Sequence, residues 1–260
     1  MRFFTLISVL ATIASATLAT AHPGSAQDVI RHTGRSVGKE SVINGVKHYI
    51  SKPFKKSTTA VIYLTDVFGL PLPENRLLVD SFARAGFFTI APDLFQNKPA
   101  PADLNTPGFD VAGFLALHGP NVTDPIIAKT VQYVRKELGY KKVAVTGYCF
   151  GGRYSFRFLQ KGKGVDVGFA AHPSLLEDGE VKAVTKPVSI AAADHDDLLP
   201  LDRLTQLEGI LKNTTLPWTV SVYGGTSHGF GVRANVTDPR QKFGKEEAFF
   251  QAVRFFQSWA

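Results

Sequence analysis

The stretch VAVTGYCFGG, from Val143 to Gly152, decides the fold class of this chain. Its first residues form a short apolar run that predicts a buried strand. The run leads into GYCFG, where Cys149 stands midway between Gly147 and Gly151. A strand followed by this spacing is typical of a nucleophile elbow, a sharp turn into a helix at the edge of an α/β sheet. We therefore expect Cys149 to be exposed to substrate at the carboxyl end of a strand.

Strand and helix patterns alternate on both sides of this stretch. Apolar runs predict further strands at 46–50, 60–64, 87–91, 167–171, 188–192 and 218–223. Helical spacing of apolar residues lies between them and at the C-terminus, over 78–85, 125–138, 204–211 and 239–256. This alternation predicts an α/β architecture, a mostly parallel sheet of about seven or eight strands with helices on both faces.

Two segments fall outside the alternation. Residues 22–45 are mostly polar and predict a lead-in that adds no core element. Residues 96–122 are rich in Pro, Gly and Asn and predict a long irregular insertion. Such an insertion forms a lid or pocket wall in some folds and a plain surface loop in others.

The first 21 residues predict a secretory signal peptide. Arg2 supplies the charge, an apolar stretch follows, and Ala19-Thr20-Ala21 is a small-x-small cleavage site. We therefore expect a secreted, extracellular protein with one domain over residues 22–260. Three glycosylation sequons, at Asn121, Asn213 and Asn235, agree with that route. No later apolar run is long enough to span a bilayer, so we expect no membrane span after cleavage.

Charge and cysteine content exclude several classes of function. The formal net charge is +7, but the basic residues are scattered and form no stripe interleaved with aromatics, so no nucleic-acid partner is expected. A basic surface does favour anionic substrates. Cys149 is the single cysteine, so it forms no internal disulfide and is either a free thiol or the partner of another chain.

Nucleophilic catalysis on this architecture needs a nucleophile, an acid and a histidine in that chain order. The 188–192 strand leads to three candidate acids, Asp194, Asp196 and Asp197, and the 218–223 strand leads to His228. An ordinary thiol is mostly protonated at neutral pH, so it needs a base that takes its proton. His228 is suited to this, and a carboxylate on its other ring nitrogen would fix the tautomer.

Two backbone amides are candidates for an oxyanion hole. The amide of Phe150 opens the helix after the elbow, and the amide of Val67 lies in the loop after the 60–64 strand. The remaining histidines have no spacing typical of metal ligands, so we expect no metal. Gly147–Gly152 matches neither a P-loop nor a dinucleotide fingerprint, so we expect no cofactor.

The chain resembles the dienelactone hydrolase family. The elbow carries this resemblance together with Asp66-Val67-Phe68-Gly69, Ala91-Pro92-Asp93, Ala171-His172-Pro173 and Ser227-His228-Gly229-Phe230, all in family order. The resemblance implies the α/β-hydrolase fold and a secreted member of the fungal type with a Cys-His-Asp triad. It also implies hydrolysis of a small ester or lactone without a cofactor.

The resemblance also assigns roles to single residues. The family acid lies four residues before a proline, which favours Asp196 ahead of Pro200. Bacterial members have a glutamate that holds the resting thiol, and Asp66 stands at that position; the alternative is that Asp66 only caps the turn after its strand. Arg233 stands near the place of an arginine that binds the substrate carboxylate.

Two other functions remain open from the sequence. A catalytically impaired hydrolase fold would bind a small ligand or protein partner without turning it over, and the shortened Asp66 motivates that alternative. A disulfide from Cys149 to another chain is a third possibility, although an elbow directs its central residue into a pocket.

Overall fold

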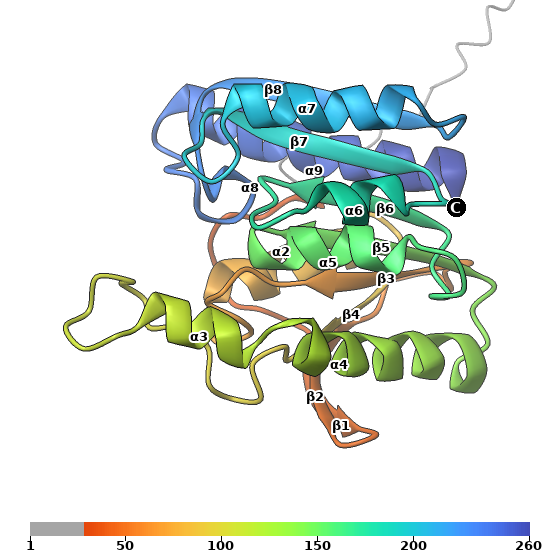
Figure 1. Ribbon diagram of the computed structural model, residues 1–260. Helices are drawn as coiled ribbons and strands as arrows, with labels where there is room; N and C mark the ends of the chain where they lie inside the picture. The colour runs from red at the N-terminus through yellow and green to blue at the C-terminus, as the bar shows by residue number, and fades with distance from the viewer. Residues whose placement is uncertain (1–28) are drawn as a thin grey trace, which may run out of the picture.

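Eight strands form one twisted sheet in the order β1-β2-β4-β3-β5-β6-β7-β8, with helices on both faces (Figure 1). The computed structural model describes residues 29–260. The strands are β1 (Lys39–Ile43), β2 (Val46–Ser51), β3 (Thr59–Leu64), β4 (Phe88–Pro92), β5 (Lys142–Tyr148), β6 (Val167–Ala171), β7 (Val188–His195) and β8 (Trp218–Ser227). All neighbours from β4 to β8 pair in parallel, whereas β1 and β2 are antiparallel to their partners. The predicted architecture is therefore confirmed.

The helices divide into two layers. They are α2 (Pro73–Arg84), α3 (Val111–Leu117), α4 (Pro120–Gln132), the π-helical turn η1 (Tyr133–Glu137), α5 (Phe150–Phe158), α6 (Asp178–Lys182), α7 (Leu201–Lys212), α8 (Phe230–Arg233) and α9 (Pro239–Trp259). Residues of α4, α5, α6 and α7 pack on one face of the sheet, and residues of α2, α8 and α9 pack on the other. Figure 1 shows the first layer in front of the strands and α9 behind them.

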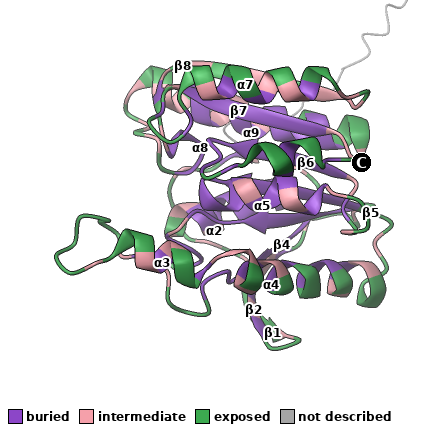
Figure 2. Ribbon diagram, viewed as in Figure 1, coloured by how far each residue is buried: buried purple, intermediate pink, exposed green. Residues whose placement is uncertain are grey.

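The central strands are buried on both faces, as Figure 2 shows. In β3, Ile62 and Leu64 belong to the core under α4 and α5, while Val61 and Tyr63 belong to the core under α2 and α9. All six residues of β3 are buried. A strand covered by helices on both sides needs apolar residues at consecutive positions, which is why the pattern is a continuous run rather than an alternation.

The structure differs from the sequence prediction at the amino-terminal edge. β1 lies within the segment predicted as a lead-in and pairs with β2 through a hairpin. The turn residues Asn44 and Gly45 both have positive φ, 53° and 76°, as a tight two-residue hairpin requires. Four of the five β1 residues are exposed, so this strand extends the sheet without adding to the core.

The insertion at 96–122 contains helical structure that its content of Pro, Gly and Asn did not predict. α3 lies inside it and projects from the body of the molecule (Figure 1). α4 begins at Pro120, not at the predicted Asp124-Pro125, because Pro120 occupies the first helical position and Pro125 is accommodated within the helix. The last turn of the predicted helix is the π-helical segment η1.

Several predictions concern processing and surface. The signal peptide lies outside the described residues. Within residues 29–260, no helix is long and apolar enough to cross a membrane. The sequon asparagines Asn121, Asn213 and Asn235 are all exposed, and their glycosylation stays a prediction.

We expect truncation of Phe82 to destabilise the fold strongly. Its ring is fully buried between Tyr63, Phe249 and Phe256. Phe82→Ala should lower the free energy of unfolding by about 3–5 kcal/mol because it leaves a cavity. Urea denaturation measures this as a lower midpoint at unchanged slope. Phe54→Ala is the control, because Phe54 is fully exposed and its loss should change stability by less than about 0.5 kcal/mol. Equal midpoints for the two variants would contradict the packing.

Candidate active site

Cys149 occupies a strained turn between β5 and α5. Its φ of 51° and ψ of −114° lie outside the regions that non-glycine residues ordinarily adopt. The two flanking glycines permit the turn. A Cβ atom on Gly147 would lie 2.1 Å from the Gly151 carbonyl oxygen, and one on Gly151 would lie 2.3 Å from the Leu64 carbonyl oxygen. Only glycine fits at either position, so the elbow spacing has a steric cause.

Hydrogen bonds from neighbouring strands hold this backbone in place. The Cys149 amide donates to the Ala171 carbonyl at 3.2 Å, and the Gly151 amide donates to the Thr65 carbonyl at 3.1 Å. The Cys149 carbonyl accepts from the Ser174 amide at 3.1 Å. The elbow is thus bound to the ends of both β3 and β6, and an unfavourable backbone conformation persists when its surroundings determine it in this way.

Asp196 is the candidate acid that contacts the candidate base. His228 Nδ1 lies 2.9 Å and 3.0 Å from the two carboxylate oxygens of Asp196. The Asp196 side chain is fully buried, and one of its oxygens also accepts from the amides of Leu198 and Leu199. These bonds fix the carboxylate against the ring. The pair has the geometry in which Nδ1 carries the proton and Nε2 is available to a nucleophile.

The other two acids have different surroundings. Asp194 accepts hydrogen bonds from the amides of Gly225 and Thr226 and so bridges β7 and β8. These amides hold the pKa of its carboxyl below the ordinary value. Asp197 is exposed. The sequence resemblance chose Asp196 among the three, and the geometry agrees with that choice.

The surroundings of His228 favour its protonated form. Burial alone would lower its pKa, but the hydrogen bond to Asp196 and the interaction with Cys149 outweigh burial and raise the pKa to about 9. Nε2 is buried and forms no well-aligned hydrogen bond within residues 29–260. The thiol is thus not hydrogen-bonded to the imidazole in this structure, although its ionised form favours the imidazolium. Such bonds are often long in an enzyme without substrate.

Asp66 does not contact the thiol in this structure. One carboxylate oxygen accepts from Asn75 Nδ2 at 2.9 Å and from the Phe68 amide at 3.2 Å; the other accepts from Arg233 Nε at 3.3 Å. Burial raises the pKa of this carboxyl. The hypothesis that Asp66 holds the resting thiol has no support here, because both oxygens are engaged elsewhere. The alternative, a cap on the turn after β3, describes the contact with Phe68.

The two predicted oxyanion donors lie where the elbow meets β3. The amides of Phe150 and Val67 donate to no acceptor within the described part of the chain. Val67 packs against the core cluster that contains Cys149, and its carbonyl accepts from the Ala100 amide at 2.9 Å. These two amides are thus available to a developing negative charge, the requirement for an oxyanion hole. Their role stays a prediction.

Arg233 lies on the wall of a pocket beside the site. Its guanidinium is 4.6 Å from the centre of the Phe68 ring and is bound through Nε to Asp66. Its two terminal nitrogens donate to no acceptor among residues 29–260. The pocket has a volume of about 240 Å³ and is otherwise apolar; it is lined by Phe68, Pro71, Leu72, Pro73, Pro99, Ala100, Ala102 and Arg233. The 96–122 insertion therefore contributes a pocket wall.

Three further residues near the site were not predicted to act there. Asn75 binds Asp66 and accepts from the Tyr63 hydroxyl at 2.8 Å. Ser174 places Oγ 3.6 Å from the sulfur of Cys149. The His172 ring stands edge-on to His228 with 5.0 Å between ring centres, and burial holds its pKa well below the ordinary value. A neutral His172 does not compete with His228 for the proton. Of these three residues, only His172 lies in a motif that the sequence analysis used, the His172-Pro173 pair of the family resemblance.

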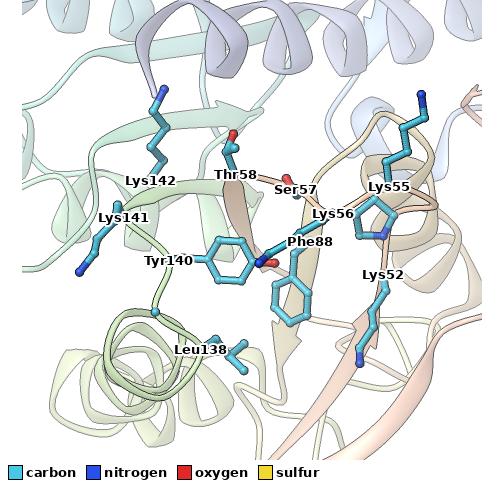
Figure 3. Close-up of a pocket in the computed structure, with 12 residues that line it drawn as sticks. Lys52, Lys55, Lys56, Ser57, Thr58, Phe88, Leu138, Tyr140, Lys141 and Lys142 are labelled. Carbon is cyan, nitrogen blue, oxygen red and sulfur yellow. The ribbon is translucent and has the colours of Figure 1, made fainter.

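A larger hollow of the described surface lies elsewhere. It has a volume of about 660 Å³ and is lined by residues 52, 53, 55–58, 88 and 138–142, including five lysines (Figure 3). These residues precede or begin β3, β4 and β5, so the hollow lies at the amino edge of the parallel strands, whereas Cys149 follows the carboxyl end of β5. In Figure 3 the labelled Lys52, Lys55, Lys141 and Lys142 point away from one another. This hollow is not the substrate pocket of Cys149.

No group of three or more His, Cys, Asp or Glu residues suited to a metal ion occurs within residues 29–260. The chemistry available at the carboxyl edge is therefore a thiol, an imidazole paired with a carboxylate, two free amides and one guanidinium.

Curated relatives cover most of the chain. It is 38% identical over 229 residues to a hydrolase named pyvD from Aspergillus violaceofuscus, an alignment that covers 88% of this chain and 93% of the relative. It is 36% identical over 239 residues to a hydrolase named tropI from Talaromyces stipitatus, with the same coverage.

Solved structures show the same fold. A putative dienelactone hydrolase from Klebsiella pneumoniae superposes with a TM-score of 0.68 at 19% identity, and the alignment covers 85% of this chain and 98% of that one. The sequence model of the dienelactone hydrolase family matches residues 46–260, which include the elbow, Asp196 and His228. This chain therefore belongs to the dienelactone hydrolase family.

Proposed function

We propose that this hydrolase cleaves a small ester or lactone by attack of the Cys149 thiolate, with His228 as the base and Asp196 as its partner. The observation that carries the proposal is the buried Asp196–His228 pair at 2.9 Å beside a single cysteine in an elbow turn. A carboxylate that binds Nδ1 leaves Nε2 free for the thiol proton.

The reaction proceeds in two halves. The proton of Sγ moves to His228 Nε2 and gives a thiolate–imidazolium pair, which agrees with the raised pKa of His228. The thiolate then attacks the carbonyl carbon to give a tetrahedral oxyanion. The amides of Phe150 and Val67 stabilise that charge, and its collapse expels the alkoxide, which takes the proton from His228. A water molecule then loses its proton to Nε2 and attacks the thioester. This step releases the acid and restores the thiol. In a lactone both products remain in one molecule.

The pocket that Arg233 lines supports a substrate class. Most of its lining is apolar, and the terminal nitrogens of Arg233 have no acceptor among residues 29–260, so an anion could bind them. A guanidinium donates two parallel hydrogen bonds to a carboxylate, which favours an ester or lactone that carries an acid group. A relative named as a dienlactone hydrolase supports a lactone within this class.

A second function is favoured by one observation. His228 Nε2 has no hydrogen-bond partner in the described chain, and the thiol contacts Ser174 instead. If the sulfur and the imidazole never formed a hydrogen bond, the protein would bind an acidic small molecule in the Arg233 pocket without hydrolysing it. Turnover by the purified protein separates the two functions.

We further propose that the protein is secreted after removal of residues 1–21 and is glycosylated at one or more of its sequons. The N-terminal pattern of charge, apolar stretch and small residues supports this route.

Removal of the sulfur should abolish hydrolysis. Cys149→Ala should lower kcat for small aryl esters and enol-lactones by at least about 10³-fold, because the covalent path is lost. The measurement is turnover against a panel of both substrate types. Cys149→Ser tests whether a hydroxyl replaces the thiol, and Ser155→Ala serves as a matched control, since Ser155 is buried in α5 without contacting the sulfur. Full activity of Cys149→Ala would exclude the mechanism.

The stability contribution of His228 should depend on pH. Its pKa of about 9 in the folded chain lies above the ordinary 6.5, so the ring binds a proton more tightly in the folded chain than in the unfolded chain. This contribution is fully present below about pH 6.5 and is lost as the pH rises through about 9. The difference in unfolding free energy between the wild type and His228→Gln should therefore shrink by up to about 3 kcal/mol from pH 6 to pH 10. Phe54→Ala, at a fully exposed residue that does not titrate, should give a difference that stays constant with pH.

Arg233 should discriminate between acidic and neutral substrates. Arg233→Met should raise KM about tenfold or more for an ester that carries a carboxylate, since a charge-assisted pair is lost. KM for a neutral ester of similar size should change less than about twofold. Steady-state kinetics on the two esters provides the measurement, with the exposed Arg254→Met as control. Equal changes for both esters would indicate a structural role through Asp66.

A further inference from the structure

The segment from His172 to Leu175, which follows β6, lies between the nucleophile and the base. Both of its end residues have positive φ, 39° at His172 and 57° at Leu175, although neither is glycine. Such conformations are uncommon for residues with a Cβ and persist only where the surroundings determine them. The chain is therefore held here against its local preference.

Contacts on three sides hold this segment. The His172 amide donates to the Ala191 carbonyl at 2.7 Å, and the Ser174 amide donates to the Cys149 carbonyl at 3.1 Å. Pro173 packs so closely on the elbow helix that a Cβ on Gly152 would lie 2.8 Å from it. The segment is consequently fixed to the elbow itself, and the direction of the Ser174 side chain is fixed with it.

Ser174 directs its hydroxyl at the sulfur. Oγ lies 3.6 Å from Sγ, and the residue is 4% exposed. The hydroxyl has no other hydrogen-bond partner in residues 29–260, so nothing in that part of the chain competes with the sulfur for it. A buried hydroxyl without such a contact would be costly, which indicates that the pair is a real part of the site.

We propose that Ser174 is a positioning residue for Cys149, whose hydroxyl donates a hydrogen bond to the thiolate. The inference rests on the proposed function, because it concerns the nucleophile of that reaction. A thiolate has no proton, so in that state only Oγ–H can be the donor. Ser174 keeps its own proton throughout, and the proton lost by Sγ goes to His228 Nε2.

A comparison of Asp66 with Ser174 supports a hydroxyl in this role. A thiolate needs donors, and an ionised carboxylate is an acceptor only, so Asp66 in its charged form could not stabilise the anion. Its oxygens are bound to Asn75, Phe68 and Arg233 in any case. Ser174 supplies a donor that already lies beside the sulfur, without adding a charge.

The test uses the single cysteine of the chain and needs no ester. The rate of alkylation by iodoacetamide is measured against pH for the full chain and for Ser174→Ala, Ser174→Thr and Ser155→Ala. In Ser174→Ala the pH of half-maximal rate should rise by about half a unit or more, because the anion loses a donor. Ser174→Thr retains the hydroxyl, so its midpoint should lie close to that of the wild type. Ser155→Ala removes a buried hydroxyl from the elbow helix α5 that does not contact the sulfur, and it should leave the midpoint unchanged.

A midpoint for Ser174→Ala that equals the wild type, or an equal shift in Ser155→Ala, would overturn the inference. Ester kinetics then supplies an independent readout: kcat of Ser174→Ala should fall about three- to tenfold while KM changes less than about twofold. A wild-type protein that hydrolyses no ester, but whose alkylation midpoint still depends on Ser174, would contradict the proposed function and leave the role of Ser174 intact.

Discussion

The site depends on one close approach, that of the elbow helix α5 to the carboxyl end of β3. Gly151 lies against the Leu64 carbonyl at a distance that no Cβ would permit, and its amide is bound to the Thr65 carbonyl at 3.1 Å. This contact holds the start of α5, with the Phe150 amide, beside the loop that carries Val67, and these are the two positions at which we expect an oxyanion hole. A single methyl group at position 151 would separate them. Oxyanion stabilisation is sensitive to such shifts because its donors act only at short range.

Two buried carboxylates near this corner have different tasks, and their partners explain the difference. Asp196 is bonded to a histidine and to two backbone amides, so its charge supports an imidazolium. Asp66 is bonded to Asn75 and Arg233, so its charge orients a guanidinium at the pocket wall. Each acid is removed from water and is stabilised by donors supplied by the fold. The site thus contains two separate charge pairs, one suited to the chemical step and one suited to the orientation of a substrate.

The sequence predicted those parts of the fold that bury apolar surface. The predicted limits of β6 agree with the observed Val167–Ala171, because a continuous apolar run can only be satisfied inside a covered sheet. β1 was missed because its residues are exposed and give no periodic signal, and α3, α6 and α8 are each shorter than two or three turns. In the site, chain order and turn spacing predicted Cys149 and His228 but left three candidate acids, and the family resemblance favoured Asp196 among them. Ser174 and Asn75 could not be found this way, since their contacts depend on a strained loop and on the direction of α2.

The position of the lysines also limits how far the net charge can attract an anionic substrate to the site. The formal charge of +7 suggested an attraction for anionic substrates, yet five lysines gather at the amino edge of the sheet, around the hollow in Figure 3. The seven residues of β5 separate that edge from Cys149, which at about 3.3 Å per residue is about 20 Å. The Debye length at physiological ionic strength is about 8 Å, so most of that field is screened before it reaches the site. The selectivity for an acid group that we propose therefore depends on a cation at the pocket itself, where the two terminal nitrogens of Arg233 have no acceptor among residues 29–260.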